Sequence, residues 1–396
     1  MSKLFQINVT ANWGSTGKIA ESIGISAIKQ GWESYMAYGR YSNPSQLQLI
    51  SIGTSLDTYW HYGMQRIMDN EGLCSVQATK KLVKKIQEIK PDVVQLHNIH
   101  DHYLNYRVLF EYLNQTDIKV VWTFHDCWAF TGHCFHFVTK GCEKWKTGCH
   151  HCPLRNEYPK TLLDKSSRNY ELKKKLFTAN QNLTIVPCSE WMEGFVKESF
   201  FKDKKITTIH NGVDIDTFAP IPMLRRNDKF RIIAVSNVWN KEKGLFDIYK
   251  LREMLPDDVE IIIVGLSAQQ MDTLPIGIKG IQRTQNVQEL VHLYNEADVL
   301  INPTYADTFP TVNLEALACG TPVITYQTGG SPEAVDEKTG IVVPQGDVEA
   351  LADAICRLRE KPLSAEDCRE RAETLFNKNK CFEQYIDLYN QLLKNK

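Results

Sequence analysis

The chain has 396 residues, of which 43% are hydrophobic and 23% are charged. This composition is typical of a globular protein, and the length suits two domains of similar size. The net charge of −1 gives no indication of nucleic acid binding. No run of about 18 apolar residues could span a bilayer, and the polar-bounded N-terminus does not resemble a signal peptide. We therefore expect a cytoplasmic protein whose eleven cysteines are reduced.

Two basic runs interrupt an otherwise even charge distribution. The segment Thr79–Lys90 has five Lys and one Glu at helical spacing, and Lys173–Lys175 follows in the same half of the chain. The simplest interpretation is a solvated helix face. The alternative is a peripheral contact with the inner membrane.

The first half of the chain, residues 1–215, alternates apolar strands with amphipathic helices. Strands are predicted at Leu4–Val9, Tyr35–Tyr38, Val93–Leu96, Val120–Phe124 and Leu183–Pro187. Helices are predicted at Gly17–Gln30, Ala78–Ile89 and Leu104–Leu113. Such alternation indicates a parallel sheet with right-handed crossovers.

The second half, residues 216–375, repeats this alternation with more strongly β-branched strands, typical of buried parallel sheets. Strands are predicted at Phe230–Val235, Glu260–Val264, Val299–Asn302, Pro322–Tyr326 and Ile341–Val343. Helices are predicted at Gly244–Met254, Val287–Asn295, Pro310–Cys319 and Val348–Leu358.

The predicted linker, Asp216–Asp228, is rich in proline and charge. A long amphipathic helix is predicted at about Ala365–Leu393, and we expect residues from about 376 to 396 to pack back on the first half. The sequence thus predicts an α/β protein with two Rossmann-like, doubly wound domains that face a cleft.

In doubly wound sheets, ligands bind at the carboxyl ends of the strands. The first such loop reads NWGSTGK, from Asn12 to Lys18. A P-loop would need Gly at position 12 and Ser or Thr at position 19, where Asn12 and Ile19 stand, and no GxGxxG pattern is present. The loop with Gly14 and Gly17 is either an anion-binding turn for the donor or a plain strand-to-helix turn.

The most informative segment is DTFPTVNLEALACG, residues 307–320, which directly follows a predicted strand. Pro310 is expected at the first position of a helix, so that the backbone around Thr308, Phe309 and Thr311 could bind a diphosphate without a metal. Glu315 lies in the same helix, where its carboxylate could accept hydrogen bonds from both hydroxyls of a ribose.

This segment resembles the retaining glycosyltransferases of family four, which have the two-domain GT-B fold. Their hallmark is two acidic residues separated by seven others and followed by small residues and G-x-P. Here Asp307, in place of the commoner Glu, and Glu315 precede Gly320-Thr321-Pro322, and the later TGGSPE string matches as well. The resemblance implies a UDP-sugar or GDP-sugar donor without a catalytic metal, with Glu315 on the ribose and Asp307 near the transferred sugar.

Family members also place a basic pair after the first strand of the donor domain. Lys243 matches the second member of that pair, whereas Asn237 stands where an Arg is usual. Lys241 could supply the missing charge. The resemblance therefore implies a diphosphate site that includes Lys243 and departs from the family pattern at Asn237.

His125 ends an apolar strand within the string VWTFHDCWAFTGHC, residues 121–134. In the resembled family, a His at this point hydrogen-bonds the donor sugar, and Asp126 could fix its tautomer or contact the acceptor. Asn211 and Gly212, in the string HNGVD, are expected to form a turn beside the donor phosphates. The first string is similar to that of exopolysaccharide and colanic-acid-type enzymes, which implies a saccharide or polyprenyl-linked acceptor.

Four cysteines in the insert 127–154 have the spacing C-x7-C-x6-C-x2-C. In a reducing compartment, such spacing suggests a structural zinc held by Cys134, Cys142, Cys149 and Cys152. Disulfides and free thiols packed in a loop are the alternatives. Four thiolates would leave no open coordination position, so a catalytic zinc is not expected.

The resemblance implies a hexosyltransferase of class EC 2.4. A nucleotide-sugar epimerase of the same fold is the second enzymatic interpretation, and it would act without an acceptor. A zinc-clipped scaffold in a polysaccharide assembly complex is the non-enzymatic one, and it would bind no donor.

Overall fold

The computed structural model describes residues 1–222 and 229–394, which form two compact units. Unit 1 contains Met1–His210 together with the chain from Phe382 onwards, and unit 2 contains Asn211–Cys381. The boundary thus falls five residues before the one predicted from the sequence. Residues 223–228 of the predicted linker and the last two residues of the chain lie outside the described residues.

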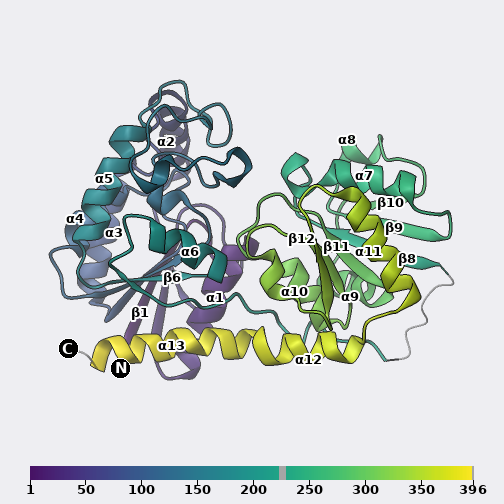
Figure 1. The fold of residues 1–396 in the computed structure, drawn as a ribbon. Helices are drawn as coiled ribbons and strands as arrows, with labels where there is room; N and C mark the ends of the chain where they lie inside the picture. Colours follow the sequence, from purple (N-terminus) through teal and green to yellow (C-terminus); the bar gives the residue numbers. More distant parts are fainter. Residues whose placement is uncertain (223–228, 395–396) are drawn as a thin grey trace. The chain divides into compact units, whose positions relative to one another are not determined.

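Unit 1 is built on a parallel sheet of seven strands in the order β3-β2-β1-β4-β5-β6-β7 (Figure 1). The strands are β1 Lys3–Asn8, β2 Glu33–Tyr38, β3 Gln48–Ser51, β4 Val93–Leu96, β5 Lys119–Phe124, β6 Leu183–Pro187 and β7 Lys205–Ile206. The helices are α1 Gly14–Lys29, α2 Ser55–Met68, α3 Val76–Ile89, α4 Tyr106–Leu113, α5 Ser166–Ala179 and α6 Glu190–Glu198. The edge strands β3 and β7 were not predicted, because both are short and only half of their residues are apolar.

Apolar side chains of α3, α4, α5 and α6 form one core with one face of this sheet. The other face carries a buried polar row, Gln6, Gln95 and Thr123, because α1 and the last helix supply hydrogen bonds there. Gln6 Nε2 donates to Ala20 O at 2.9 Å, and Gln95 Nε2 donates to Thr123 Oγ1 at 2.9 Å. Polar residues in a strand interior are stable only when they are paired in this way.

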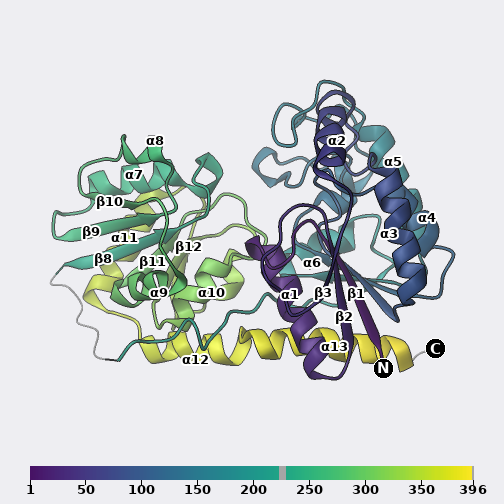
Figure 2. The ribbon, with the colours of Figure 1, turned by 180° about the vertical axis from the view of Figure 1, so that it is seen from behind.

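The last helix, α13 (Lys378–Lys394), enters unit 1 at Phe382 and crosses this polar row (Figure 2). The Tyr389 hydroxyl donates to Gln95 Oε1, and Thr123 Oγ1 donates to the Tyr385 hydroxyl at 3.3 Å. The single helix predicted at 365–393 was wrong, since α12 (Ala365–Leu375) ends before α13 begins. The backbone of Val213 pairs with Phe376 O and Lys378 N, which interrupts the helical hydrogen bonds.

Unit 2 contains a six-stranded parallel sheet in the order β10-β9-β8-β11-β12-β13. The strands are β8 Phe230–Val235, β9 Val259–Val264, β10 Ile278–Ile281, β11 Val299–Asn302, β12 Val323–Tyr326 and β13 Gly340–Val343. The helices are α7 Leu245–Met254, α8 Ala268–Met271, α9 Val287–Glu296, α10 Thr311–Ala318 and α11 Val348–Glu360. The predicted strands match except for β10, whose sequence lacks a long apolar run. Two doubly wound α/β units are therefore confirmed.

Candidate active site

The loops that follow β8 and β11 are joined at the carboxyl edge of the unit 2 sheet. Tyr305 N donates to Glu242 O at 2.7 Å. Gly244 has a φ of +73°, and a Cβ at this position would lie 2.1 Å from Pro303 O. A glycine is required where backbone segments approach so closely. This junction holds the short 3-10 turn Lys241–Lys243 beside the loop that leads to α10.

Helix α10 follows that loop and is anchored by a buried asparagine. Asn313 Oδ1 accepts a hydrogen bond from Asn302 Nδ2 at 2.9 Å, and its own Nδ2 donates to Ser331 Oγ at 2.9 Å. Pro310 has a ψ of 119° and is the N-cap, so the helix begins at Thr311, one residue later than predicted. The N-cap residue, Pro310, provides no side-chain cap. The amides of Thr311 and Val312 can therefore serve an anion.

Asp307 and Lys243 meet at this edge of the sheet. Lys243 Nζ lies 2.6 Å from Asp307 Oδ2, and the two side chains are 32% and 22% exposed. A Cβ at Gly329 would lie 1.7 Å from Asp307 O, so the TGGSPE string approaches the same backbone. Gly330 N also donates to Thr308 O at 3.2 Å. Three segments far apart in sequence thus converge beside the start of α10.

Glu315 lies on α10, and its carboxylate is oriented by a tyrosine that the sequence did not point to. The Tyr294 hydroxyl of α9 donates to Glu315 Oε2 at 3.0 Å. Burial, together with the nearby Glu315, holds the pKa of Tyr294 well above its ordinary value. The hydroxyl therefore stays protonated and remains a donor to the carboxylate.

The other residues predicted to bind the donor do not all lie at the start of α10. Thr308 and Phe309 are buried, and Asn211 Nδ2 donates to Phe309 O at 3.4 Å, which brings Asn211 to the same loop. Gly212 instead packs on α13, since a Cβ there would lie 2.4 Å from Lys378 Cα. Asn237 and Lys241 are exposed on the loop after β8. Of the two lysines, it is Lys243 that contacts Asp307.

In unit 1, His125 follows β5 and is joined to a histidine that sequence reasoning missed. His97 Nδ1 lies 3.1 Å from His125 Nε2, and His97 Nε2 lies 3.1 Å from Gln6 Oε1. Because Gln6 Nε2 donates to Ala20 O, Gln6 Oε1 must accept from His97 Nε2–H. His97 Nδ1 then accepts from His125 Nε2–H. This chain of hydrogen bonds sets the tautomer of His125, with Nδ1 as its acceptor nitrogen.

Both rings of this pair are neutral at physiological pH. Burial lowers the pKa of His125 to about 4, and burial beside His125 holds the pKa of His97 well below its ordinary range. Asp126 does not set the tautomer as the sequence allowed. Its Oδ2 lies 2.8 Å from His100 Nε2, and its Oδ1 accepts from Trp128 N at 2.8 Å. Asp126 thus orients the loop after β5.

The glycine loop of unit 1 has the turn expected from the sequence. Gly14 begins α1 with a φ of +67° and has open space around it. A Cβ at Gly17 would lie 2.7 Å from Thr10 Oγ1, so Gly17 lets the helix pack on the loop. The N-cap residue, Trp13, makes no side-chain cap. These facts fit either interpretation of the loop, so donor binding by Gly14 and Gly17 stays a prediction.

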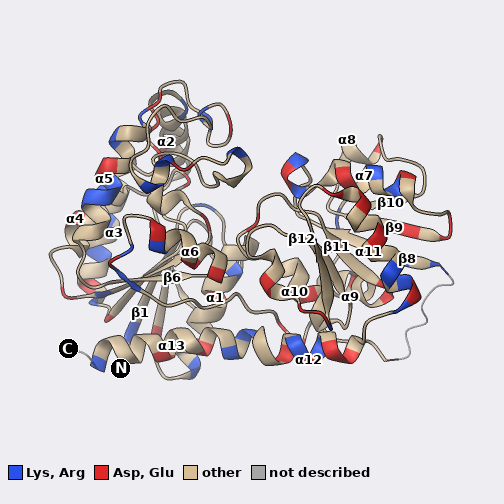
Figure 3. Cartoon of the chain, viewed as in Figure 1, with Lys and Arg blue, Asp and Glu red and all other residues tan. Residues whose placement is uncertain are grey.

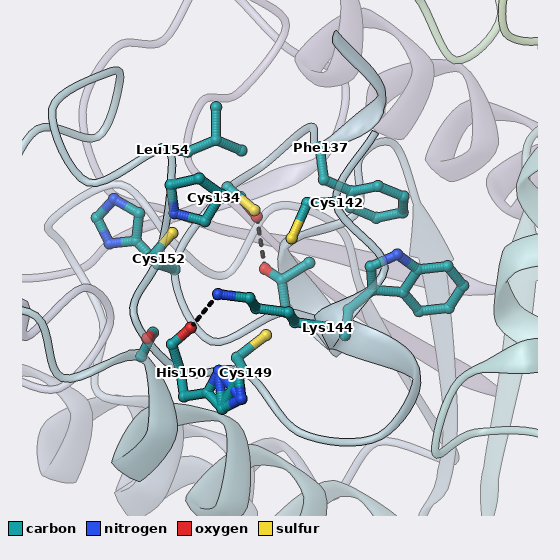
Figure 4. Close-up of a pocket in the computed structure, with 13 residues that line it drawn as sticks. Cys134, Phe137, Cys142, Lys144, Cys149, His150, Cys152 and Leu154 are labelled. Atoms are coloured by element: carbon teal, nitrogen blue, oxygen red, sulfur yellow. Dashed lines mark hydrogen bonds between the residues drawn. The ribbon is translucent and has the colours of Figure 1, made fainter. Parts of the chain in front are cut away.

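The four predicted zinc ligands, Cys134, Cys142, Cys149 and Cys152, line a single pocket in unit 1 (Figure 4). A hydrogen bond from the Cys134 thiol lowers the pKa of Cys152 to about 7, and Gly132 N donates to Cys149 Sγ at 3.2 Å. Within residues 1–222 and 229–394, however, no three His, Cys, Asp or Glu side chains are arranged so that they could hold a metal ion. Zinc binding would therefore require the cysteine side chains to rearrange, and it stays a prediction.

Metal analysis of protein purified under reducing conditions tests that prediction. If the spacing reports a zinc site, about one zinc per chain should be found, and the double replacement Cys134→Ser with Cys152→Ser should abolish it. Cys356→Ser, at an exposed cysteine of unit 2, is the matched control and should keep the metal. If the wild-type protein contained no metal, the zinc prediction would be wrong and the cysteines would be free thiols packed in the loop.

Lys173 was predicted on a solvated helix face, and this was wrong. Its side chain is buried, with Nζ 2.7 Å from Trp128 O, 3.0 Å from Thr131 O and 3.4 Å from the centre of the Trp128 ring. Burial lowers the pKa of Lys173 to about 7. The lysine of α5 therefore holds the backbone of the loop that follows His125 and Asp126.

Replacing Lys173 by methionine should destabilise the protein by about 2–4 kcal/mol, because Thr131 O loses its Lys173 donor and Trp128 O keeps only the longer hydrogen bonds from Thr131. Urea unfolding monitored by tryptophan fluorescence would measure the loss. The neighbouring Lys174→Met, on the exposed side of α5, is the control and should change stability by less than about 0.5 kcal/mol. Equal effects of the two replacements would contradict the anchoring role.

Comparison with known proteins identifies both units as glycosyltransferase domains. The model "Glycosyltransferase Family 4" matches residues 26–217, and the model "Glycosyl transferases group 1" matches residues 229–361. The colanic acid biosynthesis glycosyl transferase WcaC of Escherichia coli is 24% identical over 98% of this chain and 100% of its own length. The capsular polysaccharide biosynthesis glycosyltransferase CapM of Staphylococcus aureus is 28% identical over 42% of this chain and 48% of its own.

Solved structures of other proteins have the same fold as this chain. Sucrose-phosphate synthase from Thermosynechococcus elongatus superposes with a TM-score of 0.76 at 18% identity, over the full length of both chains. Anabaena HepE, solved in complex with UDP, superposes with a TM-score of 0.68 at 15% identity, over 99% of this chain and 100% of its own. The sheets, the α10 site and these matches lead to one conclusion: the chain belongs to the GT-B glycosyltransferases with family 4 and group 1 domains.

Proposed function

We propose that this enzyme is a retaining hexosyltransferase that moves a sugar from a UDP-sugar or GDP-sugar to a saccharide or lipid-linked saccharide, without a catalytic metal. The observation that carries the proposal is the arrangement at the start of α10. There, uncapped amides, Lys243 and a tyrosine-oriented Glu315 belong to one edge of one sheet. HepE was solved in complex with UDP, which supports a nucleotide donor.

Each part of this arrangement suits one part of such a donor. The amides of Thr311 and Val312, with the positive end of the helix dipole, would bind the diphosphate. The Lys243 ammonium would neutralise a further phosphate charge, after exchanging its contact with Asp307 for one with the donor. The second oxygen of the Glu315 carboxylate, beside the one bound by Tyr294, would accept from the ribose hydroxyls. Positive groups of this kind supply the charge neutralisation for which other enzymes use a metal.

In the proposed transfer, the acceptor hydroxyl attacks the anomeric carbon on the face from which the diphosphate leaves. The bond between the anomeric carbon and the phosphate oxygen breaks, a bond to the acceptor oxygen forms, and the acceptor proton passes to the departing diphosphate. The anomeric configuration is thereby retained. Lys243 and the α10 amides stabilise the charge that grows on the diphosphate, whereas Asp307 would lie near the transferred sugar.

Screening a panel of nucleotide-sugars for thermal stabilisation is the direct test of the donor. One or more UDP-sugars or GDP-sugars should raise the melting temperature, and a Kd about 100-fold below the ligand concentration adds about 2.7 kcal/mol. Turnover with the selected donor should survive EDTA. Stabilisation by no nucleotide-sugar would favour the scaffold interpretation, and isomerisation of the donor without an acceptor would favour the epimerase.

Replacing His125 by alanine should lower kcat by about 100-fold and change the KM for the donor much less, because the neutral ring would act at the sugar. Since the pKa of His125 is about 4, the wild-type rate should show no inflection from this residue near pH 6.5. His97→Leu should lower kcat as well, and His97→Gln should restore part of it by again accepting from His125. Wild-type turnover of the His125→Ala enzyme would contradict the role.

A further inference from the structure

Helix α2 of unit 1 turns its apolar side chains towards solvent. Leu56, Tyr59, Trp60 and Ile67 are 80%, 73%, 67% and 49% exposed. Their spacing places all four on one side of a helix. On the opposite side, the polar residues His61 and Gln65 are buried. A surface helix ordinarily has the reverse arrangement, so the exposed side of α2 needs an explanation.

A second segment extends this apolar surface. Leu162 N donates to Arg66 O at 2.9 Å, and Leu163 N donates to Ile67 O at 3.1 Å, which fixes residues 158–163 to the last turn of α2. Leu162 is 69% exposed, and Tyr158 and Leu163 are exposed as well. We call the surface formed by Leu56, Tyr59, Trp60, Ile67, Leu162 and Leu163 the α2 face.

The charges next to the α2 face are mainly positive. Arg66 lies on α2 itself, and Lys160 and Lys165 lie within three residues of Leu162 and Leu163 in the chain. Arg168 donates to Asn70 Oδ1, just after α2, at 2.9 Å. Of the nearby acids, Glu157 pairs with Lys140 at 2.9 Å, Asp164 accepts from Ser166 N and Cys152 N, and Asp57 of α2 accepts from Thr54 N at 2.8 Å. The four cations thus outnumber the two acids that have no cationic partner, Asp57 and Asp164. Figure 3 shows Lys and Arg on α5 and on loops around α2. The border of the α2 face therefore favours an anionic surface.

We propose that the α2 face docks on the surface of an anionic lipid bilayer, with Trp60, Tyr59 and the leucines in the headgroup region. Aromatic rings next to Lys and Arg are the combination that favours the membrane–water interface. A stable protein interface takes about 20–30 residues a side, many more than this narrow surface offers. Across residues 1–222 and 229–394, no helix is long and apolar enough to cross a membrane, so the contact would be interfacial.

The inner side of α2 connects this surface to the carboxyl edge of the unit 1 sheet. The His61 and Tyr62 rings lie 5.6 and 5.3 Å from the His102 ring, edge to face, and His102 lies in the loop that follows β4. Docking would thus hold that edge, which in such sheets is the ligand-binding one, next to the bilayer. The inference rests on the proposed function in this respect, since a lipid-linked acceptor would be presented from the same surface.

Sedimentation of the full chain with vesicles tests the docking. Binding to phosphatidylcholine vesicles should be weak, and adding about 30% phosphatidylglycerol should strengthen it. The double replacement Trp60→Ser with Leu162→Ser should weaken binding to the anionic vesicles by about tenfold or more. Phe246→Ser, which removes an exposed aromatic ring from unit 2, is the matched control and should bind as the wild type does.

The replaced side chains are exposed, so the double variant should keep the wild-type melting temperature and donor stabilisation. Anionic-vesicle binding that is equal for wild type and the double variant would overturn the proposal, as would its absence in the wild type. A wild-type dimer in size-exclusion chromatography that the double variant loses would assign the α2 face to protein contact instead. If the wild-type protein bound anionic vesicles but no nucleotide-sugar, the proposed function would be contradicted and the docking would still be supported.

Discussion

Replacing Lys243 by methionine should lower kcat by about 100- to 1,000-fold, corresponding to about 2.7–4 kcal/mol in the barrier. The reason is that the charge on the leaving diphosphate grows as the glycosidic bond breaks, so that a fixed ammonium stabilises the transition state more than the bound donor. The donor KM should change far less. Initial rates over a range of donor concentrations, measured with a saturating acceptor, would separate the two effects.

Lys241→Met is the matched control, since this exposed lysine lies two residues earlier on the same turn. It should retain most of the wild-type rate if the contact with Asp307 correctly identifies Lys243 as the diphosphate residue. The Lys243–Asp307 pair is partly exposed, so its loss should cost less than about 1 kcal/mol of stability. A larger rate loss at Lys241 than at Lys243 would transfer the role to Lys241.

The replacement Glu315→Gln should weaken nucleotide binding by about tenfold or more. A carboxylate that accepts from ribose hydroxyls contributes about 1.5–3 kcal/mol per charged hydrogen bond, whereas an amide of the same size contributes less. Titration calorimetry with the free nucleotide measures this directly and does not depend on the acceptor. The glutamine still offers an oxygen to the Tyr294 hydroxyl, so the fold around α10 should be retained.

Tyr294→Phe provides the comparison for Glu315. It removes the hydrogen bond that orients the carboxylate but leaves the charge, so it should weaken nucleotide binding by only about 1 kcal/mol. If Glu315→Gln bound the nucleotide as tightly as the wild type, the ribose role would be excluded. An effect of Tyr294→Phe larger than that of Glu315→Gln would indicate that the tyrosine acts through the packing of α9.

The fold could be predicted well wherever a strand is buried on both faces. Central strands such as Phe230–Val235 are continuous apolar runs, and their near neighbours in the chain are amphipathic helices, so local sequence suffices. Edge strands such as Gln48–Ser51 lack this pattern, because one side of the strand is solvated. The break between α12 and α13 was missed for another reason. It depends on Val213, which lies more than 160 residues away.

For the candidate site, the sequence by itself determined the residue types and their spacing: the acids Asp307 and Glu315, the lysine Lys243 and the strand-end His125. Local order suffices there because each residue lies in the loop that follows a strand or on the helix that begins after that loop. Only the tertiary structure decided which groups touch them. Tyr294 orients Glu315, His97 sets the tautomer of His125, and Lys173 is buried under the loop after β5. Each of these contacts joins separate elements, and an individual polar residue carries no local sign of the distant partner that permits its burial.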